Sequence, residues 1–218
     1  MKLQNYSEAF MTETQDGFRK GGHARIQNFA SNYCLQKRRE FNLETYLQFI
    51  DCEKAFDNKR REILFDILKF RHIPDTLLRA KVDSYTQNKI PIKFNNKLSE
   101  PVEIYKGVCQ GCPLSPTLLN IYLDKIITKW QKQDITRNKL SKNQQLSLLL
   151  FADNQVIIAE REDNLLKATH TLNQLITEYG LTLSVEKTKS MTFKGRDAVR
   201  TKIEIDNKII EQVNSLTI

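Results

Sequence analysis

The chain has 218 residues, of which 40% are hydrophobic and 28% charged, with only 7 Gly and 5 Pro. This composition excludes disordered and fibrous classes, and the length suits one medium-sized domain or two small ones. The formal net charge of +8 favours a polyanionic partner, with nucleic acid ahead of a membrane surface.

No apolar stretch approaches the ~20 residues that a membrane-spanning helix needs. The N-terminal residues MKLQNYSEAFMTETQDGF also lack the apolar core of a signal peptide. We therefore expect no membrane partner. The four cysteines, of which only Cys109 and Cys112 form a CxxC pair, favour an intracellular protein with free thiols.

Apolar spacing and turn-forming residues define the elements expected in the first half of the chain. They begin with a helix over 25–39 and a strand, ETYLQFI (44–50), that ends at Asp51. Next come a helix with an apolar stripe over 63–68, stopped before Pro74, and a shorter helix over 78–85. Two strands in 89–107, joined by Asn95 and Asn96, complete this half.

The second half opens with a helix over 115–130, for which we expect Ser115 as the N-cap and Pro116 at the first helical position. The polar segment 131–145 is expected to be a surface loop. The remaining elements are a hairpin over 147–160, a helix over 165–179 ended by Gly180, a strand, and a hairpin over 202–210 that turns at Asp206 and Asn207.

This order of elements predicts an α+β domain with helices packed on one face of a mainly antiparallel sheet. Such a sheet would bring Asp51, at the end of the first strand, near Asp153, in the turn of SLLLFADNQVIIAE (147–160). The simpler interpretation of that segment is a hairpin that uses ordinary turn-forming residues. Two converging carboxylates would instead suit Mg²⁺, which binds one or two carboxylates together with substrate phosphates in phosphoryl and nucleotidyl transfer.

Four longer motifs then occur in order along the chain. They are FIDCEKAFD (49–57), GVCQGCPLSPTLLNIYLD (107–124), LLFADNQVIIAE (149–160) and GLTLSVEKTKSM (180–191). Together they resemble the successive motifs of reverse transcriptases from non-LTR (LINE-type) retrotransposons. QDGFRKGG (15–22) is similar to the fingers motif that precedes them, and IEIDNKIIEQVNSL (203–216) to the region just after. The ordered set is far more specific than any one motif.

The resemblance implies a polymerase palm in which three acidic residues hold two Mg²⁺ ions. Asp51 matches the first acidic residue, and Asp153 matches the first Asp of the hairpin motif, usually F-A-D-D. Asn154 stands where the second Asp is expected. The alternatives are that Asp51 is a helix N-cap after the strand and that Asp153 is only a turn residue.

The resemblance also implies residues that contact the nucleotide or the template. Phe56 matches the aromatic residue that packs beneath the sugar and disfavours a 2′-hydroxyl, with a plain core Phe as the alternative. Gln110 matches a glutamine that contacts the incoming nucleotide or the template strand. Gly107 and Gly111 beside it would let the backbone approach the nucleic acid closely.

Three basic residues complete the implied site. Arg19 and Lys20 align with fingers residues that bind the triphosphate, with a solvated basic loop as the alternative. Lys187 matches the lysine placed to help the departing pyrophosphate, with an ordinary surface lysine as the alternative.

Several positions depart from the family pattern. Cys109 stands where an Arg or another larger residue is usual, Ser184 where an Asn is usual, and Gly22-His23-Ala24 where basic and hydroxyl-bearing residues are expected. The largest departure is Asn154, because an amide keeps an acceptor oxygen but loses the negative charge on which Mg²⁺ sites depend.

We therefore expect a reverse transcriptase domain, with a fingers segment over 1–40, a palm core over 41–201 and a hairpin over 202–218 at the start of the primer-grip region. The resemblance implies an RNA template, a DNA primer and dNTP as partners, leaves the oligomeric state open, and is compatible with a nuclear location. Asn154, an incomplete fingers region and a missing thumb indicate a partial, degenerate copy with impaired activity. The alternative is an inactive remnant that at most binds nucleic acid.

Overall fold

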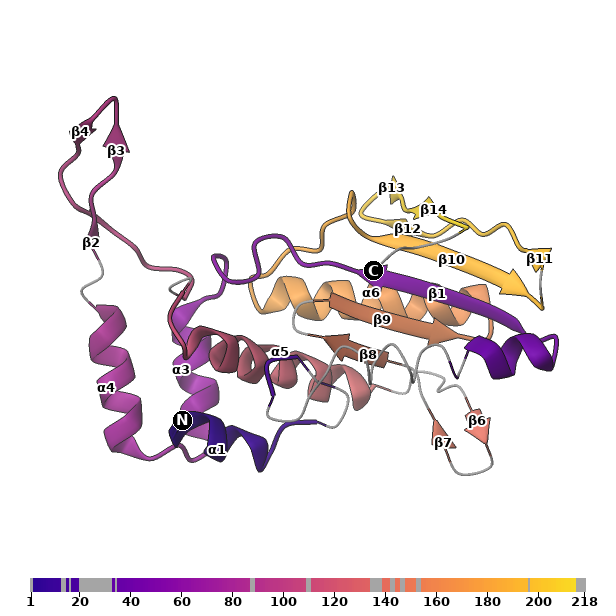
Figure 1. Ribbon diagram of the computed structural model, residues 1–218, viewed down its shortest axis with the longest axis horizontal. Helices are drawn as coiled ribbons and strands as arrows, with labels where there is room; N and C mark the ends of the chain where they lie inside the picture. The colour runs from indigo at the N-terminus through magenta and orange to yellow at the C-terminus, as the bar shows by residue number, and fades with distance from the viewer. Residues whose placement is uncertain are drawn as a thin grey trace.

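Figure 1 shows the computed structural model of the chain. The structure describes residues 2–12, 15, 17–19, 33, 35–86, 89–108, 111–133, 139–141, 144–145, 148–151, 154–195 and 197–214.

The centre of the fold is an antiparallel sheet in which β1 (Glu44–Ile50) lies between β9 (Asn154–Ala159) and β10 (Lys189–Lys194). β8 (Leu148–Phe151) continues the sheet beyond β9. On the other side, β11 (Asp197–Ala198) pairs antiparallel with β10, and β14 (Glu211–Gln212) pairs parallel with it. The strand order β11-β10-β1-β9-β8 places the first strand of the sheet in its middle.

Helices cover one face of this sheet (Figure 1). α6 (Glu162–Glu178) packs on β1 and β9, α5 (Ser115–Gln131) packs on α6, and α3 (Arg61–Phe70) packs on α5. Two side-chain hydrogen bonds join α5 to α6 and to the residue that follows α6. Trp130 Nε1 donates to the carbonyl of Ala168 at 3.0 Å, and the Tyr122 hydroxyl donates to the carbonyl of Tyr179. Burial raises the pKa of Tyr122 to about 12. The predicted α+β architecture is confirmed.

Alternation along β1 divides its apolar residues between two faces. Tyr46 and Ile50 join the main core beneath the helices. Leu47 instead packs with Ile158 and Phe193 in a small cluster on the opposite face, against Leu35 of a helical segment over 35–40. That segment is the described part of the helix expected over 25–39; the remainder of that prediction, apart from residue 33, lies outside the described residues.

The predicted helices of the middle and second half are confirmed by their packing and their ends. In α3, Leu64, Ile67 and Leu68 form the buried stripe, and α4 (Asp75–Thr86) follows Pro74. Gly180, at φ +72°, follows the C-cap of α6. The amides of Gly180 and Leu181 donate to the carbonyls of Thr177 and Ile176 at 2.8 and 3.0 Å, which is the Schellman arrangement.

The segment between α4 and α5 forms a hairpin arm made of two short ladders. β2 (Lys89–Ile90) pairs with β5 (Val102–Glu103), and β3 (Lys93–Phe94) pairs with β4 (Lys97–Leu98) around Asn95 and Asn96, both with positive φ. Pro91 and Pro101 lie between the ladders, where their missing amide protons interrupt the pairing. In Figure 1 this arm extends beyond α4, away from the sheet.

Three details differ from or extend the sequence-based expectations. α5 begins at Ser115, with Leu114 as its N-cap, because residues 112–114 already turn and the Ser115 amide donates to the carbonyl of Cys112 at 3.0 Å. The segment expected to be a loop contains a strand pair, β6 (Lys139–Ser141) and β7 (Gln144–Gln145). β12 (Glu204–Ile205) and β13 (Lys208–Ile209) form the last hairpin around residues 206–207, as predicted.

α1 (Lys2–Glu8) packs on α5 and completes the described helices. Within the part of the chain that the structure describes, no helix combines the length and apolar character required to cross a membrane.

Arg61, buried at the start of α3, ties the arm to the body of the domain. Its guanidinium donates to the carbonyl oxygens of Tyr85, Ile104, Lys106 and Gly107, the first at 2.9 Å and the last at 2.9 Å. These carbonyls lie on the chain before β2 and after β5. One planar side chain therefore holds both ends of the arm together, which a single amine could not do.

We expect Arg61→Lys to lower the free energy of unfolding by about 3 kcal/mol, because the ammonium would leave buried carbonyls without donors. Arg60→Lys is the matched control. The side chain of Arg60, next to Arg61 in the sequence, is half-exposed and makes one ion pair, with Glu62 at 3.5 Å. The control should change stability by less than about 0.5 kcal/mol. Urea unfolding followed by the fluorescence of buried Trp130 measures both, and equal stability of the two variants would contradict the assignment.

Candidate active site

The candidate site lies where β1 ends and the β8–β9 hairpin turns. Ile50 pairs with Gln155, so Asp51 comes directly after the pair and next to Asn154 in the register. Asn154 in turn pairs with Phe151 at the end of the β8–β9 ladder. Asp153 lies outside the described residues. Asn154, expected in the turn, is the exposed first residue of β9.

The backbone of Asp51 is hydrogen-bonded to the segment between α6 and β10. The Ser184 amide donates to the Asp51 carbonyl at 2.8 Å, and the Asp51 amide donates to Thr188 Oγ1 at 3.5 Å. The Glu53 amide donates to the carbonyl of Thr182 at 2.8 Å. Two of the four recognised motifs therefore contact each other through backbone hydrogen bonds, and these fix the direction of the chain at Asp51.

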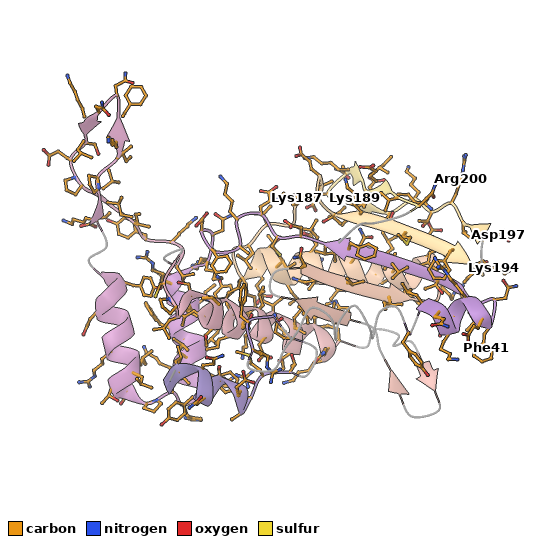
Figure 2. All side chains as sticks on the ribbon, in the orientation of Figure 1. Phe41, Lys187, Lys189, Lys194, Asp197 and Arg200 are labelled. Atoms are coloured by element: carbon orange, nitrogen blue, oxygen red, sulfur yellow. The ribbon has the colours of Figure 1, made fainter. Side chains whose placement is uncertain are left out.

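The structure brings two predicted site residues together in an ion pair. Lys187 Nζ lies 3.8 Å from Asp51 Oδ1, with 71% of the lysine side chain exposed against 23% of the aspartate side chain. Figure 2 shows Lys187 with Lys189 at one end of β10, and Lys194 at the other. A largely exposed ammonium group therefore lies beside the carboxylate that the motif assigns to metal binding.

Phe56 is half-buried and packs against the main core. Its ring meets that of Phe18 edge-on at 6.4 Å, and Lys59 Nζ lies 4.6 Å from the centre of its ring. Lys59 is fully buried, which a sequence pattern does not foresee for a lysine. The packing matches the core alternative for Phe56, and its contact with a sugar stays a prediction.

Gly107 is required by a close approach of two backbone segments. At φ +77°, its amide donates to the carbonyl of Lys59 at 2.8 Å, and a Cβ at this position would lie 2.7 Å from the carbonyl oxygen of Asp57. Gly111 also has a positive φ, +84°, but nothing lies within 4 Å of a Cβ built there. Approach of either glycine to nucleic acid stays a prediction, and Gln110 lies outside the described residues.

Arg19 uses its guanidinium inside the protein. It forms an ion pair with Glu8 at 2.7 Å and donates to the carbonyls of Thr12 and Gln15 at 2.9 and 3.0 Å. These bonds stabilise the N-terminal segment next to the body of the domain. Triphosphate binding by Arg19 stays a prediction and would require some of these bonds to be exchanged; Lys20 lies outside the described residues.

Asp124 is a positioning residue that the sequence reasoning missed. Its buried carboxylate on α5 accepts from the amide of Thr12 at 2.8 Å and from Arg71 Nη2 at 2.7 Å. The Arg71 guanidinium also stacks on Phe10, 4.5 Å from the centre of the ring. The available signal was the position of Asp124 directly after Leu123 and two residues before Ile126, both on the apolar face expected for this helix. Through these two hydrogen bonds, Asp124 joins the N-terminal segment and the end of α3 to α5.

An antiparallel sheet backed by helices, with an aspartate at the end of its central strand beside a hairpin turn, is the palm of a template-directed polymerase. The family model described as "Reverse transcriptase (RNA-dependent DNA polymerase)" matches residues 1–213, and the chain belongs to this family. The recognition from the ordered motifs is thereby confirmed.

Among curated proteins, the chain is 26% identical over 186 residues to the "Retrovirus-related Pol polyprotein from type-1 retrotransposable element R2" of Popillia japonica. That match covers 83% of this chain and 30% of the relative. The corresponding R2DM polyprotein of Drosophila melanogaster is 24% identical over 151 residues, covering 69% of this chain and 14% of the relative. The chain thus spans less than a third of the length of these relatives.

Solved structures agree on the fold. Telomerase from Candida tropicalis in complex with the TWJ fragment of telomeric RNA has a TM-score of 0.67 at 14% identity, over 90% of this chain and 33% of that one. Apo telomerase of the same organism, truncated from its C-terminal domain, has a TM-score of 0.63 at 15% identity, over 93% and 41%. At this identity the likeness establishes the polymerase fold alone.

The two glycines of the candidate site give a matched test of the close backbone approach. We expect Gly107→Ala to destabilise the domain by about 3 kcal/mol or more, because positive-φ strain adds to the clash with Asp57. Gly111→Ala carries the strain without the clash and should cost about 1 kcal/mol. Urea unfolding of both variants measures the difference, and an equal loss would show that crowding at Asp57 is unimportant.

Proposed function

We propose that this domain is built for RNA-directed DNA synthesis by two-metal nucleotidyl transfer. In the proposal, Asp51 and Asp153 are the carboxylate ligands of two Mg²⁺ ions, and the substrates are an RNA template, a DNA primer and dNTP. The observation that carries it is the register of β1 with β9, in which Ile50 pairs with Gln155. This register sets the end of β1, directly before Asp51, level with the start of β9, and β9 is the strand that follows Asp153 in the sequence.

The residues at this edge fit a hard divalent cation. Carboxylate oxygens on rigid strand ends are the ligands that Mg²⁺ prefers, together with water and substrate phosphates. Within the described residues, no group of three or more His, Cys, Asp or Glu side chains could hold a metal. In the proposal the protein ligands are two carboxylates, as is usual for Mg²⁺ sites that share their ions with phosphates. Bound ions would neutralise phosphate charge and align the attacking and leaving oxygens.

The other residues would act on the substrate. Lys187, 3.8 Å from Asp51 and largely exposed, can turn its ammonium towards the departing pyrophosphate. The ring of Phe56, which contacts Phe18 and Lys59, would pack against the sugar of the incoming nucleotide. In this proposal Phe56 keeps its contacts within the domain, whereas Lys187 would leave Asp51.

Asn154 makes the proposed site weak. It is exposed at the first position of β9, beside Asp51 in the register, and contributes an amide where a second carboxylate would add charge. A second candidate function, nucleic-acid binding without catalysis, is favoured by this substitution. Restoring the carboxylate separates the two functions. The boundaries 1–40, 41–201 and 202–218 and the intracellular location stay predictions.

Primer extension on an RNA template with Mg²⁺ tests the proposal. We expect little or no extension by the unmodified chain and an increase of at least about tenfold in Asn154→Asp, because the new carboxylate supplies metal-binding charge. Asn207→Asp is the matched control, since it adds the same charge to the turn of a different hairpin, between β12 and β13. It should extend primers no better than the unmodified chain.

The results of the primer-extension assay show which feature of the chain limits its activity. Strong extension by the unmodified chain that disappears in Asp153→Ala would contradict the impaired site while supporting the metal ligand. If neither the chain nor Asn154→Asp extends primers, yet both bind nucleic acid, the second candidate function is correct. An equal gain in Asn207→Asp would show that charge alone, rather than its place, was responsible.

Competition between Lys187 and a cation for Asp51 gives a test that needs no turnover. We expect Lys187→Ala to bind Mn²⁺ several-fold more tightly, because a positive neighbour 3.8 Å from the Asp51 carboxylate is removed. Asp51→Asn should abolish this binding, whereas Asp163→Asn, at an exposed position in the first turn of α6, should not. Electron paramagnetic resonance of free Mn²⁺ measures all three, and unchanged affinity in Asp51→Asn would remove Asp51 from the metal site.

A further inference from the structure

The arm, defined as residues 89–106, exposes an unusual set of apolar side chains. Phe94 and Tyr105 are each 75% exposed, more than any other large hydrophobic residue among those described. Their exposed apolar neighbours on the arm are Ile90, Ile92, Leu98, Val102 and Ile104. A monomeric domain rarely leaves so many large side chains in water along one segment, so the arm has the character of a binding surface.

The arm also carries more positive than negative charge. Its lysines are Lys89, Lys93, Lys97 and Lys106, against two acidic residues, Glu100 and Glu103. Glu103 is already engaged, because it pairs with Lys89 at 3.2 Å and accepts a hydrogen bond from the Tyr105 hydroxyl. The remaining surface near the tip is therefore cationic.

Cross-strand pairing places aromatic and cationic groups side by side. Phe94 lies directly opposite Lys97, and Lys93 directly opposite Leu98, so each face of the tip joins an apolar group to an amine. The Asn95-Asn96 turn exposes no large side chain that would cover them. An exposed ring beside an exposed amine is the combination that binds a base and its phosphate in single-stranded nucleic acid.

A protein partner fits these features less well. The cores of protein interfaces are depleted in lysine, and here lysines alternate with the apolar residues along both strands of the tip. A nucleic acid partner accounts for both kinds of residue at once, and the net charge of +8 on the whole chain favours it.

The base of the arm is continuous with the candidate active site. The carbonyls of Ile104, Lys106 and Gly107 are held by the same Arg61 guanidinium, and the Gly107 amide is bonded to Lys59 beneath Phe56. A strand bound along the arm would therefore run towards residues 107–111, which the family motif assigns to the nucleotide or template.

We propose that the arm binds the unpaired template RNA next to the active site, with bases stacked on Phe94 and Tyr105 and phosphates facing Lys93 and Lys97. This inference rests on the proposed function for the identity of the strand. Binding to the arm itself requires neither metal nor catalysis.

Fluorescence anisotropy with a labelled single-stranded RNA oligonucleotide, without dNTP or divalent ions, tests the arm. Phe94→Ala should weaken binding about tenfold, because one stacking platform is lost. Phe41→Ala is the matched control, since Phe41 is 69% exposed and lies at the opposite end of the molecule from the arm (Figure 2). The control should bind as the unmodified chain does. With the same RNA annealed to its complement, Phe94→Ala should have little effect, because paired bases are not available for stacking.

Four results would overturn the proposal: no RNA binding by the unmodified chain, equal affinities of Phe94→Ala and Phe41→Ala, an equal loss on single-stranded and paired RNA, or an arm substitution that changes self-association in sedimentation but not RNA affinity. The last would identify the arm as a protein interface. Repeating the titration with Asp51→Asn keeps the two proposals apart. RNA binding that is sensitive to Phe94→Ala but not to Asp51→Asn supports the arm even if no variant extends a primer.

Discussion

The antiparallel pairing of β1 with β9 and β10 is the interaction on which the rest of the structure depends. It joins residues far apart in the sequence, as in the pairs Ile50 with Gln155 (105 positions) and Glu44 with Lys194 (150 positions). Because a shift of one residue in register would move every side chain of β1 to the other face of the sheet, the register also fixes the edge at which Asp51 emerges. The helices on the sheet and the candidate site at its edge both follow from this pairing.

Around that edge, backbone contacts join the recognised motifs into one unit. Residues 182–188 hold the chain at Asp51, while Gly107 packs its backbone against Asp57. Arg61 extends this unit outward by holding the base of the arm. The same contacts explain why two glycines with similar φ angles are expected to differ in their tolerance of a side chain.

Local elements were largely predictable because their signals are local. The stripe of α3, the C-terminal glycine of α6 and the Asn-Asn and Asp-Asn turns each act over a few residues. The N-cap of α5 was predicted one residue late, because the preceding turn at 112–114 depends on how the chain arrives there. The strand pair in 131–145 was missed because polar residues carry little periodicity.

The sequence by itself determined the class of protein, because an ordered set of motifs survives without knowledge of any contact. It also predicted Asp51 and Lys187 as site residues, and the tertiary structure decided that these two form an ion pair. Only that structure revealed that Arg19 is bonded to Glu8, that Asp124 is buried beside Arg71, and that the arm leaves Phe94 in water. Those outcomes depend on which distant groups meet, and such contacts are set by the packing of the whole chain rather than by residue type or spacing.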